Sequence, residues 1–141
     1  MKPKKASADW YIAATHWLTA TISMVVFSIV VGIILALISQ NPTVILIGFI
    51  ILYPLMMWLA VKYSARFLDK TYVIKNANQI VILSTIYIVI VGGGFRVMSF
   101  LSKGVITPDH VGFLLAIIVF YIASKKYIKN NSTEQSPIQT V

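Results

Sequence analysis

The chain has 141 residues, of which 58% are hydrophobic and 11% are charged, and its formal net charge at pH 7 is +8. In soluble globular domains roughly a quarter of the residues are charged, so a chain this apolar cannot present a polar surface to water on all sides. The apolar residues form long blocks with basic residues just outside them, which indicates membrane insertion beside anionic lipid headgroups rather than nucleic-acid binding. Because there is no cysteine, disulfides, thiol chemistry and iron–sulfur ligation are excluded.

Hydropathy predicts a first transmembrane helix over about residues 12–39 and a second over about residues 43–63. A short uncharged turn that contains Pro42 separates them, and a turn this short requires an antiparallel hairpin. Pro54 lies in the middle of the second helix. Proline removes one backbone hydrogen bond and clashes with the preceding turn, so we expect a kink there.

Three basic residues lie at intervals of four at the end of the second span and beyond it, namely Lys62, Arg66 and Lys70. A helix that extends beyond the membrane places residues at this spacing on one face. We expect this basic face to contact lipid headgroups or a partner protein.

The third predicted span, about residues 79–100, contains three adjacent glycines, Gly92, Gly93 and Gly94. Adjacent glycines cannot share one helix face, so they indicate a flexible or unwound point rather than a GxxxG contact. Arg96 follows them at the outer edge of the hydrocarbon region. Two interpretations are open for this charge: it reaches outward to the headgroups, or it faces the bundle and pairs with Asp109 or an anionic ligand.

The fourth predicted span covers about residues 109–127, close to the minimum length for crossing a bilayer. Thr107, Pro108 and Asp109 have the side chains preferred at a helix start. We therefore expect one all-α membrane domain over residues 1–129, an integral membrane four-helix bundle of antiparallel hairpins. The polar segment 130–141 is expected to be a disordered cytoplasmic tail.

The distribution of positive charge predicts the orientation of the four spans. All but two of the 12 Lys and Arg residues lie in the N-terminal segment, the second connection or the C-terminal flank. The exceptions are Arg96 and Lys103. This bias places both termini in the cytoplasm and the protein in a cell membrane, the inner or plasma membrane, as a multi-pass protein.

The two histidines, His16 and His110, lie near opposite ends of their helices and are expected on opposite sides of the bilayer. A shared haem or metal ion is therefore disfavoured, and each histidine is interpreted as a polar interfacial residue or a candidate functional residue. No Asp or Glu lies in the interior of a span, because Asp109 stands at the very start of the fourth, and this absence disfavours proton-coupled export. With no nucleophile–base pair, ligand cluster or phosphate loop, we expect neither an enzyme nor a bound cofactor.

The sequence favours a small non-enzymatic membrane protein that acts through intramembrane protein contacts with a membrane partner or with itself. It fits an accessory subunit of an inner-membrane assembly, such as a secretion or conjugation machine, or an immunity or exclusion factor. The alternative is a homo-oligomeric channel or transporter for an anionic solute, with Arg96 as the anion contact.

Overall fold

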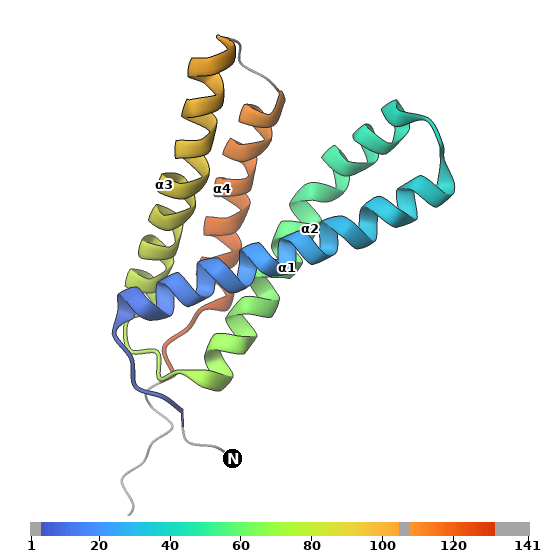
Figure 1. The fold of residues 1–141 in the computed structure, drawn as a ribbon. Coiled ribbons are helices and arrows are strands. Elements are labelled where there is room, and N and C mark those ends of the chain that lie inside the picture. The colour runs from blue at the N-terminus through green and yellow to red at the C-terminus, as the bar shows by residue number, and fades with distance from the viewer. Residues whose placement is uncertain (1–3, 105–107, 132–141) are drawn as a thin grey trace, which may run out of the picture.

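The computed structural model describes residues 4–104 and 108–131. Its four helices, in chain order, are α1 (Asp9–Ile38), α2 (Pro42–Thr71), α3 (Ala77–Lys103) and α4 (Pro108–Tyr127) (Figure 1). The all-α class and the number of helices predicted from the sequence are confirmed.

Three of the helices, α1, α2 and α3, are long and apolar enough to cross a membrane. These three support the interpretation as a membrane protein with several spans. The fourth helix has 20 residues and carries Lys125 and Lys126 in its last turn. It is not among these three helices, so a fourth crossing of the bilayer by α4 stays a prediction.

The largest difference from the predicted boundaries is at the end of α2, which continues to Thr71 instead of ending near residue 63. Buried side chains continue at helical spacing through this extension, at Val61, Ser64, Ala65 and Leu68. The core therefore holds the helix beyond the apolar block. Hydropathy marks only the end of the apolar block. It does not detect the packing that keeps the chain helical beyond that point.

Neither helix breaker interrupts its helix in this structure. The second helix is α-helical through Pro54, and the third is α-helical through its three glycines. The third is thus not unwound at Gly92–Gly94, and Gly92 instead makes room for a neighbouring ring. A role of Pro54 or of the glycines as a hinge stays a prediction. Among the described residues only Gly104 has a positive φ, 66°, where it caps α3 in a left-handed conformation that favours glycine.

The helices form a ring in which each packs against two neighbours, in the order α1, α2, α4, α3. The turn of residues 39–41 joins the first two as one antiparallel hairpin, and the last two form a second hairpin. Figure 1 shows the two hairpins close together at one end and diverging toward the other.

The core occupies only one half of the ring. Among the described residues, no buried side chain lies after Met24 in α1, before Met56 in α2, after Ile88 in α3 or before Ala116 in α4. We call the part that contains the buried residues the closed half, and the rest the open half. The hairpins diverge toward the open half (Figure 1).

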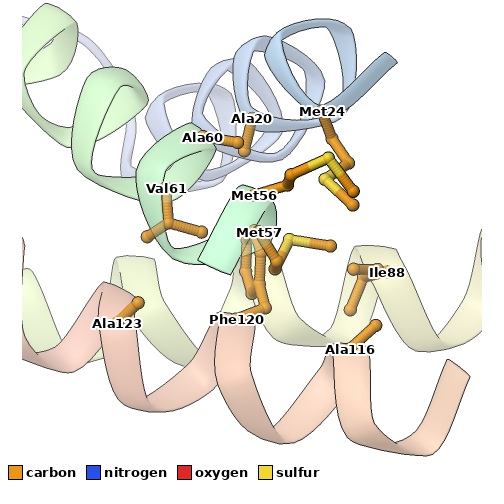
Figure 2. Packing of buried hydrophobic residues seen from close by; sticks show 10 residues of the cluster. All are labelled: Ala20, Met24, Met56, Met57, Ala60, Val61, Ile88, Ala116, Phe120 and Ala123. Carbon is orange, nitrogen blue, oxygen red and sulfur yellow. The ribbon is translucent and has the colours of Figure 1, made fainter. Parts of the chain in front are cut away.

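Small and flexible side chains line the last buried layers of the closed half (Figure 2). Ala20 and Ala60 let the first hairpin close tightly, and small residues are the usual means of close approach between membrane helices. Met24, Met56 and Met57 lie at the boundary with the open half, beside Ile88 and Phe120. Methionine fills irregular gaps because its side chain is unbranched.

Each hairpin stays packed within itself in the open half. A Cβ atom at Gly32 would lie 3.2 Å from Phe49, and one at Gly48 would lie 2.9 Å from Leu35, so the glycines bring α1 and α2 together. A Cβ at Gly92 would lie 2.5 Å from the ring of Phe113 in α4. The hairpins therefore separate as two packed pairs.

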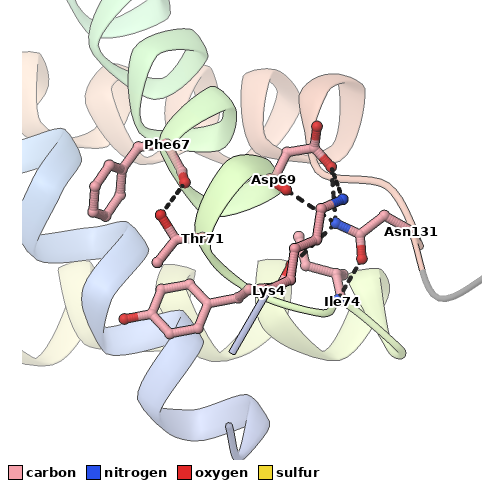
Figure 3. Close-up of polar contacts among 7 residues, drawn as sticks. Lys4, Phe67, Asp69, Thr71, Ile74 and Asn131 are labelled. Atoms are coloured by element: carbon pink, nitrogen blue, oxygen red, sulfur yellow. Dashed lines mark hydrogen bonds and ion pairs between the residues drawn. The ribbon is translucent and has the colours of Figure 1, made fainter. Parts of the chain in front are cut away.

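Both described ends of the chain contact the connection between α2 and α3, in the closed half. Lys5 pairs with Tyr72 as an isolated bridge, and the amide of Lys5 donates to the Thr71 carbonyl at 2.8 Å. Asn131 accepts from the Ile74 amide at 2.7 Å and donates to the Asp69 carboxylate at 2.8 Å (Figure 3). The first and last described stretches of the chain, at Lys5 and Asn131, thus lie at the same end of the bundle.

The predicted disordered tail begins at residue 130, but its first two residues are held in this junction. The Asn130 side chain accepts a hydrogen bond from the Ala77 amide at 2.7 Å. Residues 132–141, the rest of the predicted tail, lie outside the described part of the chain.

Candidate functional site

Four polar side chains among the described residues have no exposed surface, and the largest of them is His16; the others are Ser64, Ser84 and Ser124. His16 lies on α1 and reaches two other helices. Its Nδ1 is 2.8 Å from Ser64 Oγ of α2, and its Nε2 is 3.0 Å from Ser124 Oγ of α4. The imidazole also packs against Phe120, with ring centroids 5.3 Å apart.

The hydrogen bonds around His16 define which ring nitrogen carries the proton. Ser64 Oγ donates to the backbone carbonyl of His16 at 2.9 Å, so its hydroxyl proton is already used. Ser64 must therefore accept from Nδ1–H. In the neutral imidazole Nε2 is then an acceptor, and Ser124 donates to it. Every polar atom of this buried triad has a partner, as buried polar groups require.

The triad connects three helices at one level of the closed half and leaves no ring nitrogen for a ligand or substrate. His16 is thus a core residue whose side chain faces neighbouring helices, and its depth near the membrane interface stays a prediction. The sequence contains a signal for this burial. Ile12, His16, Ala20 and Met24 follow at four-residue spacing, which puts His16 in the middle of an apolar face.

His110 does not join His16. Its backbone lies in the first turn of α4, 14 residues and about 21 Å of helix before Ser124. This separation agrees with the expectation that the histidines lie at opposite ends. The side chains of Asp109 and His110 lie outside the described residues, and so does the predicted pairing of Asp109 with Arg96.

Arg96 is half-buried and faces the second helix of its own hairpin. Its Nη1 donates to the Gly92 carbonyl at 3.3 Å, and its Cζ lies 4.3 Å from the centroid of the Phe113 ring. Phe113 is thus held between the guanidinium and the bare backbone of Gly92. A cation–π contact of this kind stabilises a guanidinium away from bulk water. Of the two interpretations of Arg96, this geometry favours the one in which it faces the bundle.

One face of α3 shows how the hairpins separate. In the closed half Tyr87 packs against Trp17 of α1, with ring centroids 6.1 Å apart. Gly94 lies two turns further along the same face, and a Cβ there would find no described atom within 4 Å. Leu101, after two more turns, is 76% exposed. The face that contacts α1 at Tyr87 is therefore uncovered in the open half.

The predicted basic face is present on the extended α2. Lys62 is half-exposed, and Arg66 and Lys70 are exposed, on the side opposite the buried residues of this helix. The four-residue spacing of these residues was enough to predict the basic face, because the face requires only that the helix continue beyond the apolar block. The sequence did not indicate the aromatic ring beside Lys62, which belongs to Tyr127 of α4.

Comparison with known proteins identifies no relative. No protein-family model, no curated protein and no solved structure matches this chain.

Proposed function

We propose that this chain is a non-enzymatic four-span protein of the inner or plasma membrane that acts through protein contacts within the bilayer. The role that fits it best is an accessory subunit of a membrane assembly, such as a secretion or conjugation machine, or an immunity or exclusion factor. The open half supplies the contact surface, and the closed half holds the two hairpins together.

The observation that carries the proposal is the uncovered face of α3. Four-helix bundles usually pack along their length at crossing angles of about 20°. Here two internally packed hairpins separate and expose large apolar side chains on this face of α3, including Met98 and Leu101. Association of membrane helices depends on close packing, because lipid tails are as apolar as the side chains. A partner's transmembrane helix between the hairpins would supply the packing that the open half lacks.

The polar side chains support a role that does not involve a reaction. The His16 imidazole is enclosed and uses both nitrogens on serine hydroxyls. The Arg96 guanidinium lies on Phe113, so it packs between helices of one hairpin instead of facing an open pathway. An anion channel would need Arg96 to face the permeating ion. The alternative of an anion channel therefore has less support from this position of Arg96 than from the sequence alone.

The proposed topology predicts a clear labelling pattern. Because the chain has no cysteine, single cysteines can be introduced without background. Gln40→Cys, in the first turn, should react with a membrane-impermeant maleimide on intact cells. Lys75→Cys should react only after the membrane is permeabilised. Lys129→Cys should behave like Lys75→Cys, whereas labelling of Lys129→Cys on intact cells would show that α4 does not complete a fourth span.

The functional proposal is tested by gentle extraction from native membranes, crosslinking and mass spectrometry. We expect one other membrane protein in reproducible stoichiometry with this chain. Recovery should fall when Gly94→Leu fills part of the uncovered face, and it should not change when Thr21→Ala alters an exposed hydroxyl of α1. Recovery of the chain only with itself would contradict the proposal and direct attention to flux through an oligomer.

A further inference from the structure

At the closed half, the contact between α2 and α4 contains an aromatic pair at the depth where the basic residues begin. The Trp58 indole Nε1–H donates to Tyr127 Oη at 2.9 Å, and the two rings meet edge to face with centroids 5.7 Å apart. Both side chains are half-buried. Tryptophan and tyrosine are enriched where a membrane helix passes through the headgroup layer.

Two lysines converge on this aromatic pair from different helices. Lys62 Nζ of α2 lies 5.8 Å from the Tyr127 ring centroid. Lys126 Nζ of α4 lies 5.8 Å from the same centroid and 5.1 Å from that of Trp58. The two ammonium groups are thus separated by at most twice the shared distance. Two positive charges beside one aromatic pair attract an anion, and a bound anion would offset their mutual repulsion.

The described carboxylates are engaged elsewhere. Asp9 accepts a hydrogen bond from Asn76, and Asp69 contacts Asn131 and Lys4 in the terminal junction. Within the described residues, no acidic side chain forms an ion pair with either lysine of the aromatic pair. An anion bound beside these two lysines would therefore come from outside the described part of the chain.

We propose that Trp58, Lys62, Lys126 and Tyr127 bind the headgroup phosphate of an anionic phospholipid, and we call this cluster the headgroup site. Both ammonium groups donate to phosphate oxygens. Tyr127 Oη accepts from Trp58 and still carries its own proton, which it donates to the same phosphate. Basic pockets between membrane helices on the cytoplasmic side are suited to such headgroups.

The helix that carries Lys62 also provides a place for an acyl chain. Trp58, Leu55 and Ile51 precede Lys62 at intervals of three and four, and Leu55 and Ile51 are 54% and 69% exposed. An acyl chain can lie along this stripe while its phosphate occupies the headgroup site. Because a charged site is continuous with an exposed apolar stripe, the observations favour a lipid over a soluble anion.

The test is native mass spectrometry of the detergent-solubilised full chain titrated with dioleoyl phosphatidylglycerol, with dioleoyl phosphatidylcholine as the zwitterionic reference. Lys62→Gln/Lys126→Gln should weaken binding of the anionic lipid roughly 30-fold. Lys5→Gln/Lys75→Gln removes the same charge from the same end of the bundle and should change binding less than about twofold. Tyr127→Phe, which keeps the ring, should weaken it about fivefold.

Three results would overturn the assignment. Equal weakening by both lysine pairs would show general attraction by net charge instead of a site. Equal affinity for the two lipids in the unaltered chain would exclude selection of an anionic headgroup. Displacement of the lipid by inorganic phosphate at matched concentration would assign the site to a free anion. Unchanged far-ultraviolet circular dichroism of each variant shows that the helices have formed.

Discussion

His16→Ala is expected to lower the free energy of unfolding by about 3 kcal/mol, measured by titrating detergent-solubilised protein with dodecyl sulfate and following helix content. The substitution leaves a cavity beside Phe120 and removes the hydrogen-bond partner of Ser124. Buried hydrogen bonds between membrane helices average only about 0.6 kcal/mol, so most of the loss comes from the cavity and the unpaired hydroxyl.

Thr21→Ala is the matched control for this experiment. The Thr21 hydroxyl bonds to the Trp17 carbonyl of its own helix and is exposed, so its removal should change stability by less than about 0.5 kcal/mol. If His16→Ala and Thr21→Ala have equal effects, the triad does not hold the closed half together.

The two serines of the triad should differ in a defined direction. Ser64 makes two hydrogen bonds, one with the imidazole and one with the His16 carbonyl, whereas Ser124 makes the single bond with Nε2. Ser64→Ala should therefore destabilise the protein more than Ser124→Ala, by about 1 kcal/mol in the same titration. The reverse order would contradict the proton assignment at His16.

Gly92→Leu and Gly94→Leu are expected to act in opposite directions, although the two positions are two residues apart. At Gly92 even a Cβ atom would lie 2.5 Å from Phe113, so a leucine must displace the ring from under Arg96. We expect a loss of about 2 kcal/mol. At Gly94 the added side chain meets no described atom within 4 Å, and leucine is the better helix former. Stability should rise by up to about 0.5 kcal/mol.

This pair also separates stability from function. Gly94→Leu fills part of the uncovered face, so it should reduce recovery of the partner while the bundle becomes no less stable. Gly93→Ala serves as the control in α3, because its Cβ would lie at an ordinary 3.8 Å from Phe113. Destabilisation by Gly94→Leu would show that α3 is covered at this level and would remove the basis for an open half.

Local sequence patterns account for the helices, their antiparallel pairing and the basic face. Hydropathy and the short turn at Pro42 are enough to predict the first hairpin, and four-residue spacing is enough for Lys62, Arg66 and Lys70. Prediction from local sequence patterns fails where tertiary contacts determine the structure. The extension of α2 to Thr71 depends on Leu68 being in the core, and the hydrogen bonds of His16 depend on two serines that are 48 and 108 residues away in sequence.

There is a physical reason why the open half could not be predicted from the sequence. Side chains that face lipid and side chains that face a partner have the same apolar composition, so Phe95 or Leu101 carries no mark of its surroundings. The packing of Tyr87 against Trp17, the open space at Gly94 and the exposure of Leu101 show that one face of α3 loses its neighbour along its length.

The most direct test of the account is photocrosslinking in native membranes from a diazirine side chain placed at Leu101, with Ile82 as the reference position. Both residues are exposed on α3, but Leu101 is in the open half and Ile82 is in the closed half. The account predicts one protein adduct of constant mass from Leu101, weakened by Gly94→Leu, and only lipid adducts from Ile82. Lipid adducts alone from both positions would contradict it, because the open half would then face the bilayer and not a protein.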